Sequence, residues 1–196
     1  MRIGYSTHAT STDNVAGIAA GHSDPDLAPL GVDQYGKRDA LWANRNFDLM
    51  VTSDLLRSRR TAELAFESRD VPRRVETRLR ECGYGALDGA PKAEVDAIRA
   101  SRVSEPFPGG GESYEAVAAR IRALLDDLVG EFPGGTVLLI GHHAPYVVLE
   151  HIANGVPLAD ELASTARSDY WQPEWEYRYG EWAAAARMSE PCVCSA

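Results

Sequence analysis

Two kinds of hydrophobic pattern alternate along the chain. Short apolar runs bounded by polar residues occur at 47–52 and 136–140, as is typical of strands buried on both faces of a parallel sheet. Apolar residues recur at helical spacing in 55–66, 113–129 and 145–153. The pattern therefore predicts strands that alternate with helices, as in an α/β protein with a mostly parallel sheet.

The first predicted strand runs into a polar loop that contains a histidine. Ile3 begins a short β-compatible segment, His8 lies where it turns, and no helical period is visible before Asn14. Open α/β sheets bind ligands beyond the carboxyl ends of their strands, so His8 is a candidate functional residue. A single histidine is more often a hydrogen-bonded structural residue, so a functional role of His8 depends on motifs elsewhere in the chain.

Three arginines follow the second predicted strand, in the first turns of the helix predicted over 55–66. Ser53 and Asp54 are residue types that cap helices. Cations at a helix N-terminus oppose the helix dipole, which makes them poor choices for stability alone. A bound phosphate would resolve the conflict, because amide groups and a guanidinium fork both bind it. The arginines are Arg57, Arg59 and Arg60.

Four ordered segments resemble motifs of the histidine phosphatase superfamily, the phosphoglycerate-mutase-like fold. They are Thr7-His8-Ala9-Thr10-Ser11-Thr12-Asp13-Asn14, Ser53-Asp54-Leu55-Leu56-Arg57-Ser58-Arg59-Arg60-Thr61-Ala62, Leu79-Arg80-Glu81-Cys82-Gly83-Tyr84-Gly85-Ala86-Leu87-Asp88-Gly89 and Gly141-His142-His143. The resemblance covers roughly residues 1–155. It implies a three-layer α/β/α sandwich with a mostly parallel central sheet and helices on both faces, as a single domain over 1–196.

The resemblance also implies the chemistry and the residues that perform it. His8 is the expected nucleophile, which forms a phosphohistidine. Arg57 and a protonated His142 are expected to stabilise the phosphoryl oxygens, and Glu81 to protonate the leaving oxygen. The expected substrate is a small phosphorylated metabolite, without metal or cofactor. Further expected substrate contacts are Thr7, Ser11, Asn14, Arg60 and His143.

The first motif departs from the family pattern at three adjacent positions. The family has Arg before the nucleophilic His and Gly-Glu after it, whereas this chain has Thr7, Ala9 and Thr10. A neutral hydroxyl in place of a charge-assisted contact costs about one to two decades of rate or affinity unless another group compensates. Two alternatives therefore stay open: a repurposed non-phosphatase enzyme that uses His8, Glu81 and His142 as acid–base groups, and a phosphate-sensing or protein-binding module.

Composition and charge limit the partners. The 196 residues are 44% hydrophobic and 25% charged, with a net charge of −9, which argues against nucleic acid or an anionic membrane as the main partner. The longest aliphatic run, 137–140, is too short to span a bilayer, and the amino terminus lacks a run of signal-peptide length. Three cysteines form no disulfide framework. A cytoplasmic protein is expected.

The remaining segments carry weaker predictions. Residues 90–112 form an insertion with one helix predicted over 93–101, and we expect it to act as a lid over the site. The aromatic segment 170–182 predicts an edge hairpin or edge strand, which either packs as core or forms a pocket or dimer surface. Residues 186–196 are expected to form a flexible tail. His22 is expected to be solvent-exposed, and His151 to be structural.

Overall fold

A computed structural model gives the fold and describes residues 1–34, 42, 45–165, 175–180 and 183–187. The elements in chain order are β1 (Arg2–Thr7), α1 (Thr12–Ala16), β2 (Ile18–Ala19), α2 (Pro29–Asp33), β3 (Leu49–Thr52), α4 (Leu56–Ala65), β4 (Arg73–Val75), the short 3₁₀ helices η1 (Thr77–Leu79) and η2 (Gly85–Leu87), β5 (Ala90–Pro91), α5 (Lys92–Arg99), α6 (Tyr114–Glu131), β6 (Thr136–Gly141), α7 (His143–Asn154), α8 (Leu158–Thr165), β7 (Trp175–Gly180) and β8 (Ala183–Arg187).

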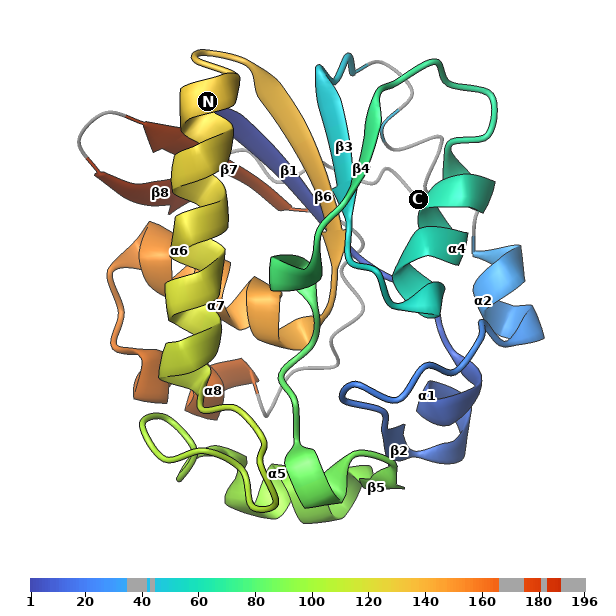
Figure 1. Cartoon of the computed structure of the whole chain (residues 1–196), viewed down its shortest axis with the longest axis vertical. Helices are drawn as coiled ribbons and strands as arrows, with labels where there is room; N and C mark the ends of the chain where they lie inside the picture. The colour runs from blue at the N-terminus through green and yellow to red at the C-terminus, as the bar shows by residue number, and fades with distance from the viewer. Residues whose placement is uncertain (35–41, 43–44, 166–174, 181–182, 188–196) are drawn as a thin grey trace.

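A six-stranded sheet in the order β4-β3-β6-β1-β7-β8 forms the centre of the protein (Figure 1). The first four strands of this order pair in parallel. Strand β7 is antiparallel to β1, and β8 is antiparallel to β7. The expected mostly parallel sheet is thus confirmed, with an antiparallel hairpin at one edge.

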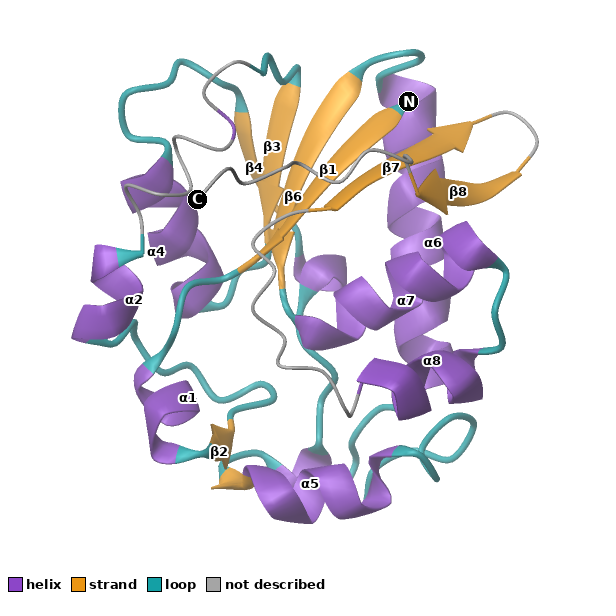
Figure 2. Cartoon of the chain, turned by 180° about the vertical axis from the view of Figure 1, so that it is seen from behind, coloured by secondary structure: helices purple, strands orange, loops and turns teal. Residues whose placement is uncertain are grey.

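Alternation along the parallel strands divides the core into two layers. Val51 and Leu139 belong to the cluster that packs with α6 and α7, whereas Met50 and Leu138 belong to the cluster that packs with α4. Successive side chains of a strand point to opposite faces of the sheet, so an unbroken apolar run serves both layers. Figure 2 shows α6 and α7 on one side of the sheet and α4 and α2 on the other. This confirms the three-layer arrangement.

Small elements lie beyond the carboxyl ends of the parallel strands. Strand β2 pairs antiparallel with β5, and α5 follows β5 directly. Together with α1 they lie below the sheet in the view of Figure 1, at the end where His8 leaves β1. The predicted insertion therefore lies at the same end of the sheet as the candidate site.

Several element boundaries differ from the sequence-based expectation. Helix α2 covers Pro29–Asp33, and residues 35–41 and 43–44 lie outside the described residues. Helix α4 has Leu55 as its N-cap, without a side-chain cap. Helix α7 begins at His143 rather than at Pro145. Differences of one or two residues are common at helix ends, and at α7 the carboxylate of Glu81 binds the first amides of the helix.

The carboxyl-terminal predictions are confirmed in part. Strands β7 and β8 form the expected edge hairpin, although residues 170–174 and 181–182 are outside the described residues. The tail predicted over 186–196 begins too early, because residues 186 and 187 belong to β8. The rest of that tail is not described. Among the described helices, none combines the length and the apolar character needed to cross a membrane.

Candidate active site

His8 leaves the end of β1 in a fixed orientation. Its backbone N–H donates to the carbonyl of Gly141 at the end of β6, with an N···O distance of 2.9 Å. Its ring nitrogen Nδ1 lies 2.6 Å from the carbonyl oxygen of Ala9. A carbonyl only accepts hydrogen bonds, so Nδ1 must carry the proton. In the neutral ring, Nε2 then holds the lone pair that a nucleophile needs.

Arg57 is buried beside this loop. Its side chain comes from the first turn of α4, and the residue is 2% exposed. The two terminal nitrogens donate to the carbonyls of Gly21 and Ser23, each at 2.8 Å. Burial lowers the pKa of Arg57, against the opposing effect of Glu81. The loop at 21–23 thus holds a guanidinium group that the helix dipole alone would disfavour.

Glu81 lies at the amino end of α7. One carboxylate oxygen accepts from the amides of Cys82 and Ala144 at 2.8 and 3.0 Å, and the other accepts from the amide of His143 at 3.0 Å. The amides of His143 and Ala144 belong to the first turn of α7, where helices leave N–H groups without internal partners. The carboxylate therefore caps the helix that carries the histidine pair.

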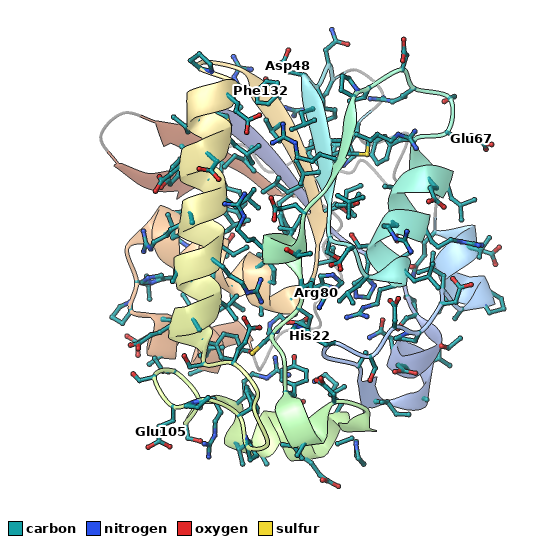
Figure 3. All side chains as sticks on the ribbon, in the orientation of Figure 1. His22, Asp48, Glu67, Arg80, Glu105 and Phe132 are labelled. Carbon is teal, nitrogen blue, oxygen red and sulfur yellow. The ribbon has the colours of Figure 1, made fainter. Side chains whose placement is uncertain are left out.

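Two side chains fix the backbone of the Glu81 segment. Arg120 of α6 donates to the carbonyls of Arg78, Arg80 and Glu81 at 2.5, 2.9 and 3.0 Å. His22 Nε2 donates to the same Glu81 carbonyl at 2.9 Å, beside the segment that contains Arg80 (Figure 3). The expectation that His22 is solvent-exposed is therefore wrong: its side chain is 33% exposed and packed against this segment.

His142 is fully buried next to His8. The two ring centroids are 5.0 Å apart, Nε2 lies 2.6 Å from the Ser53 hydroxyl oxygen, and the Tyr5 hydroxyl donates to the His142 carbonyl at 2.5 Å. Burial lowers the pKa of His142 well below its usual value, and the neighbouring Arg57 and His8 side chains add to the effect. The protein without bound anion therefore holds a neutral ring, contrary to the protonated His142 expected from the sequence.

His8, Arg57 and Glu81 line a cavity of about 140 Å³ at the carboxyl ends of the strands, whereas His142 lies behind His8 and is not among the lining residues. Its walls combine three cationic side chains, two carboxylates and two histidines with a few apolar groups. The lining residues are His8, Asn14, Ile18, Ala19, Ala20, Gly21, Arg57, Glu81, Tyr84, Lys92, Asp96, Arg99 and His143.

The residues expected to contact substrate divide into two groups. Asn14 and His143 line the cavity, whereas Thr7, Ser11 and Arg60 are not among its lining residues. Ser11 is fully buried, and it forms a reciprocal cap of α1 with Asn14. Arg60 Nε lies 3.8 Å from a carboxylate oxygen of Asp26.

Sequence reasoning missed one wall of the cavity. Lys92, Asp96 and Arg99 of α5 all line it, and their spacing of four and three residues places them on one face of a helix. Arg99 is 6% exposed, and it donates to Asp96 Oδ1 and to His143 Nδ1, each at 2.7 Å. The sequence did contain a signal for this wall: a charged helix face within the segment that was expected to form the lid.

Thr61 was also overlooked, although it lies within the second motif. Its hydroxyl accepts from the amide of Ala9 at 2.9 Å and donates to the carbonyl of Arg57 at 2.7 Å. It thereby connects the loop that follows His8 to the helix that carries Arg57.

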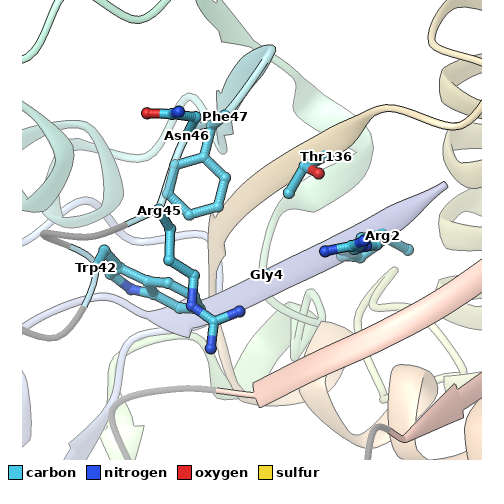
Figure 4. A pocket seen from close by; sticks show the side chains of 8 residues that line it. Arg2, Gly4, Trp42, Arg45, Asn46, Phe47 and Thr136 are labelled. Atoms are coloured by element: carbon cyan, nitrogen blue, oxygen red, sulfur yellow. The ribbon is translucent and has the colours of Figure 1, made fainter.

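A second cavity of about 270 Å³ lies at the opposite end of the sheet, where β1 and β6 begin (Figure 4). The rings of Trp42 and Phe47 meet edge to face beside it, 5.4 Å apart, with the guanidinium of Arg45 over Trp42. Ligands of open α/β sheets bind at the carboxyl ends of the strands, so the smaller cavity is the candidate active site. The larger one is lined by Arg2, Ile3, Gly4, Trp42, Arg45, Asn46, Phe47 and Thr136.

Comparison with known proteins agrees with this geometry. Residues 7–181 match the profile of the histidine phosphatase superfamily, branch 1. The chain belongs to the histidine phosphatase superfamily. The glucosyl-3-phosphoglycerate phosphatase of Mycobacterium tuberculosis is 31% identical to it, over 93% of this chain and 94% of the relative. The adenosylcobalamin/alpha-ribazole phosphatase of Salmonella typhimurium is 28% identical, over 72% of this chain and 74% of the relative.

Solved structures share the fold over most of the chain. The mycobacterial glucosyl-3-phosphoglycerate phosphatase in complex with VO3 has a TM-score of 0.78 and 26% identity, covering 95% of this chain and 96% of that structure. YhfR of Bacillus stearothermophilus has a TM-score of 0.80 at 19% identity, covering 95% of this chain and 94% of that structure. The relatives are phosphatases and mutases of small phosphorylated metabolites.

Proposed function

We propose that this chain is a phosphoric monoester hydrolase that acts on a small phosphorylated metabolite through a phosphohistidine at His8. The observation that carries the proposal is the cavity at the carboxyl ends of β1 and β6. His8, Arg57 and Glu81 all line it, and the His142 ring packs against that of His8. The mycobacterial relative makes sugar and glycerate phosphates the first substrates to test.

The first half of the reaction transfers the phosphoryl group to the protein. Nε2 of His8 attacks phosphorus in line, and the bond from phosphorus to the leaving oxygen breaks. Arg57 and His142 stabilise the charge on the phosphoryl oxygens. Glu81 gives a proton to the departing oxygen. The alcohol then leaves, and the phosphoryl group stays on His8.

The second half returns the protein to its initial state. A water molecule attacks the phosphohistidine, Glu81 takes a proton from it, and the N–P bond breaks to release inorganic phosphate. Side chains stabilise the charge on the phosphoryl oxygens and protonate the leaving oxygen, so these steps need no metal. Helix α5 serves as the substrate-facing cover, since Lys92, Asp96 and Arg99 face the same cavity.

One observation favours a second candidate, a different acid–base reaction on the same scaffold. Thr7 stands where the family motif has the arginine that precedes the nucleophile, and it does not line the cavity. Lys92 and Arg99 supply positive charge to the same cavity. This charge favours a phosphorylated substrate, and so favours the phosphatase reaction over the second candidate.

The proposal is tested by release of inorganic phosphate from a panel of sugar phosphates, glycerate phosphates and aryl phosphates. We expect turnover by the parent protein and none by His8→Ala. His151→Ala is the matched control, because His151 of α7 hydrogen-bonds the Val156 carbonyl beyond the end of that helix and is not among the residues that line the cavity. Activity that survives in His8→Ala, or is lost equally in both variants, would count against the proposal.

A further inference from the structure

Ser53 has an unusual place among the residues behind the cavity. It follows β3 directly and is fully buried. The sequence suggested a helix cap, yet the N-cap of α4 is Leu55. Its hydroxyl oxygen instead lies 2.6 Å from Nε2 of His142. Strands β3 and β6 are parallel neighbours, so their carboxyl ends bring the two residues together.

The hydrogen bonds around Ser53 determine where its hydroxyl hydrogen goes. The amide of Leu55 donates to the hydroxyl oxygen, with an N···O distance of 3.3 Å. The Ser53 amide itself donates to the Ser58 hydroxyl at 3.2 Å, and that hydroxyl is turned to the Ile140 carbonyl at 2.7 Å. A serine hydroxyl has one hydrogen to donate. Within the described part of the chain, the acceptor that remains for it is Nε2 of His142.

The geometry points to Ser53 as a positioning residue: it donates its hydroxyl hydrogen to Nε2 of His142 and thereby keeps the ring proton on Nδ1. Nδ1 is buried, and none of the described residues forms a hydrogen bond with it. A buried donor without a partner costs free energy. A phosphoryl oxygen bound between the two histidine rings would supply the missing acceptor.

The surrounding charges agree with a neutral ring that acts as a donor. Arg57, His8, Arg120 and His22 all disfavour a positive charge on His142. The Glu81 carboxylate lies beside the same helix start, where it is bound to the amides of His143 and Ala144. Tyr5 faces the backbone carbonyl of His142 and not its ring.

A neutral donor has a mechanistic consequence. His142 can stabilise the phosphoryl oxygens through Nδ1–H without binding or releasing a proton in the cycle, which leaves the proton transfers to Glu81. This catalytic part rests on the proposed phosphatase reaction. The tautomer itself is a property of the protein without substrate, so the two are tested apart.

The direct test is the ¹⁵N NMR spectrum of the parent protein with labelled histidines near neutral pH, with His142 assigned through His142→Asn. We expect the signals of a neutral ring whose Nδ1 is protonated and whose Nε2 is bare. A protonated Nε2, with Nδ1 either bare or protonated, would overturn the inference. This result stands whether or not the protein hydrolyses a phosphate ester.

The catalytic part is tested with Ser53→Ala and with Ser53→Thr, which keeps the hydroxyl. We expect kcat/KM of Ser53→Ala on an aryl phosphate to fall about 10- to 100-fold, as a misdirected catalytic group does, with recovery in Ser53→Thr. The deficit should shrink at acid pH, because a doubly protonated ring regains its Nδ1–H. A deficit that is the same at every pH would show a merely structural role.

Discussion

His8 and its neighbours show how single residues determine the properties of the candidate site. His8 has one ring nitrogen committed to the Ala9 carbonyl, and Arg57 has its terminal nitrogens committed to the loop at Gly21 and Ser23. Thr7 is the exception, because it offers a hydroxyl where the family motif offers a guanidinium. A substitution that restores a positive charge at position 7 is therefore the most informative single change.

Thr7→Arg tests whether the site is a phosphate site with one contact missing. We expect activity on a generic aryl phosphate to rise about tenfold or more, since a charge-assisted contact of this kind is worth at least about 1.4 kcal/mol. Thr7→Gln is the control, because it adds length without charge. If the arginine variant is folded and binds vanadate no better than the parent, the second candidate function gains.

Glu81→Gln tests the proton donor. The variant should lose more activity on alkyl phosphates, whose leaving oxygens need a proton, than on nitrophenyl phosphate, whose leaving group does not. The carboxylate accepts three backbone hydrogen bonds, and the Gln amide group cannot accept them all. Thermal denaturation therefore has to show that the variant is folded. An equal loss on both substrates would mean that Glu81 is not the acid.

At the scale of elements, the glycines after Glu81 mark a close packing of two loops. Gly85 has a φ of +61°. A Cβ atom there would lie 2.3 Å from the Pro108 carbonyl oxygen and 2.6 Å from the Gly111 nitrogen. The segment 107–112 thus fills the space against which the Glu81 loop bends. The insertion therefore packs against the loop that follows Glu81 as well as lining the cavity.

Gly85→Ala should therefore destabilise the protein. We expect the free energy of unfolding in urea to fall by about 1–3 kcal/mol, the range for strained backbone conformations. Gly130→Ala is the matched control, since Gly130 lies within α6 and a Cβ there meets no atom within 4 Å. That variant should gain up to about 1 kcal/mol. Equal stability of the two variants would contradict this account of the loop.

The elements also show what the sequence can and cannot predict. His8, Arg57, Glu81 and His142 were predicted as site residues from the family resemblance, because the motifs that contain them are local in the sequence. Ser53 was not, because its partner lies 89 positions away and its local context is that of a helix cap. The start of α7 was missed for a similar reason: Glu81, from a distant segment, caps it.

At the scale of the whole molecule, the fold buries His142 fully and the adjacent His143 in part, at the start of α7. Burial lowers the pKa values of His142 and His143 well below the usual value, with Arg57 and His8 adding to the effect at His142 and Arg99 and Lys92 at His143. The unfolded chain takes up protons at these positions near its ordinary pKa of about 6.5, whereas the folded chain resists them. The free energy of unfolding should therefore fall as the pH falls below that value. Above it, the contribution of these two histidines should be constant.

We expect the free energy of unfolding to fall between about pH 6.5 and 5.5 by up to about 1.4 kcal/mol per unit for each of the two histidines. His143→Gln, which removes one of them and keeps an acceptor for Arg99, should reduce that slope by about half. Urea titrations across this range measure it. A slope that is absent in the parent would show that the two rings are not held neutral.

The central claim is that His8 carries the phosphoryl group, and rapid-quench trapping with a ³²P-labelled phosphate ester tests it most directly. The account predicts a label that is stable in alkali and labile in acid, that maps to the peptide containing His8, and that is absent from His8→Ala. Labelling that persists in His8→Ala, or turnover by the parent protein without any labelled intermediate, would contradict the account.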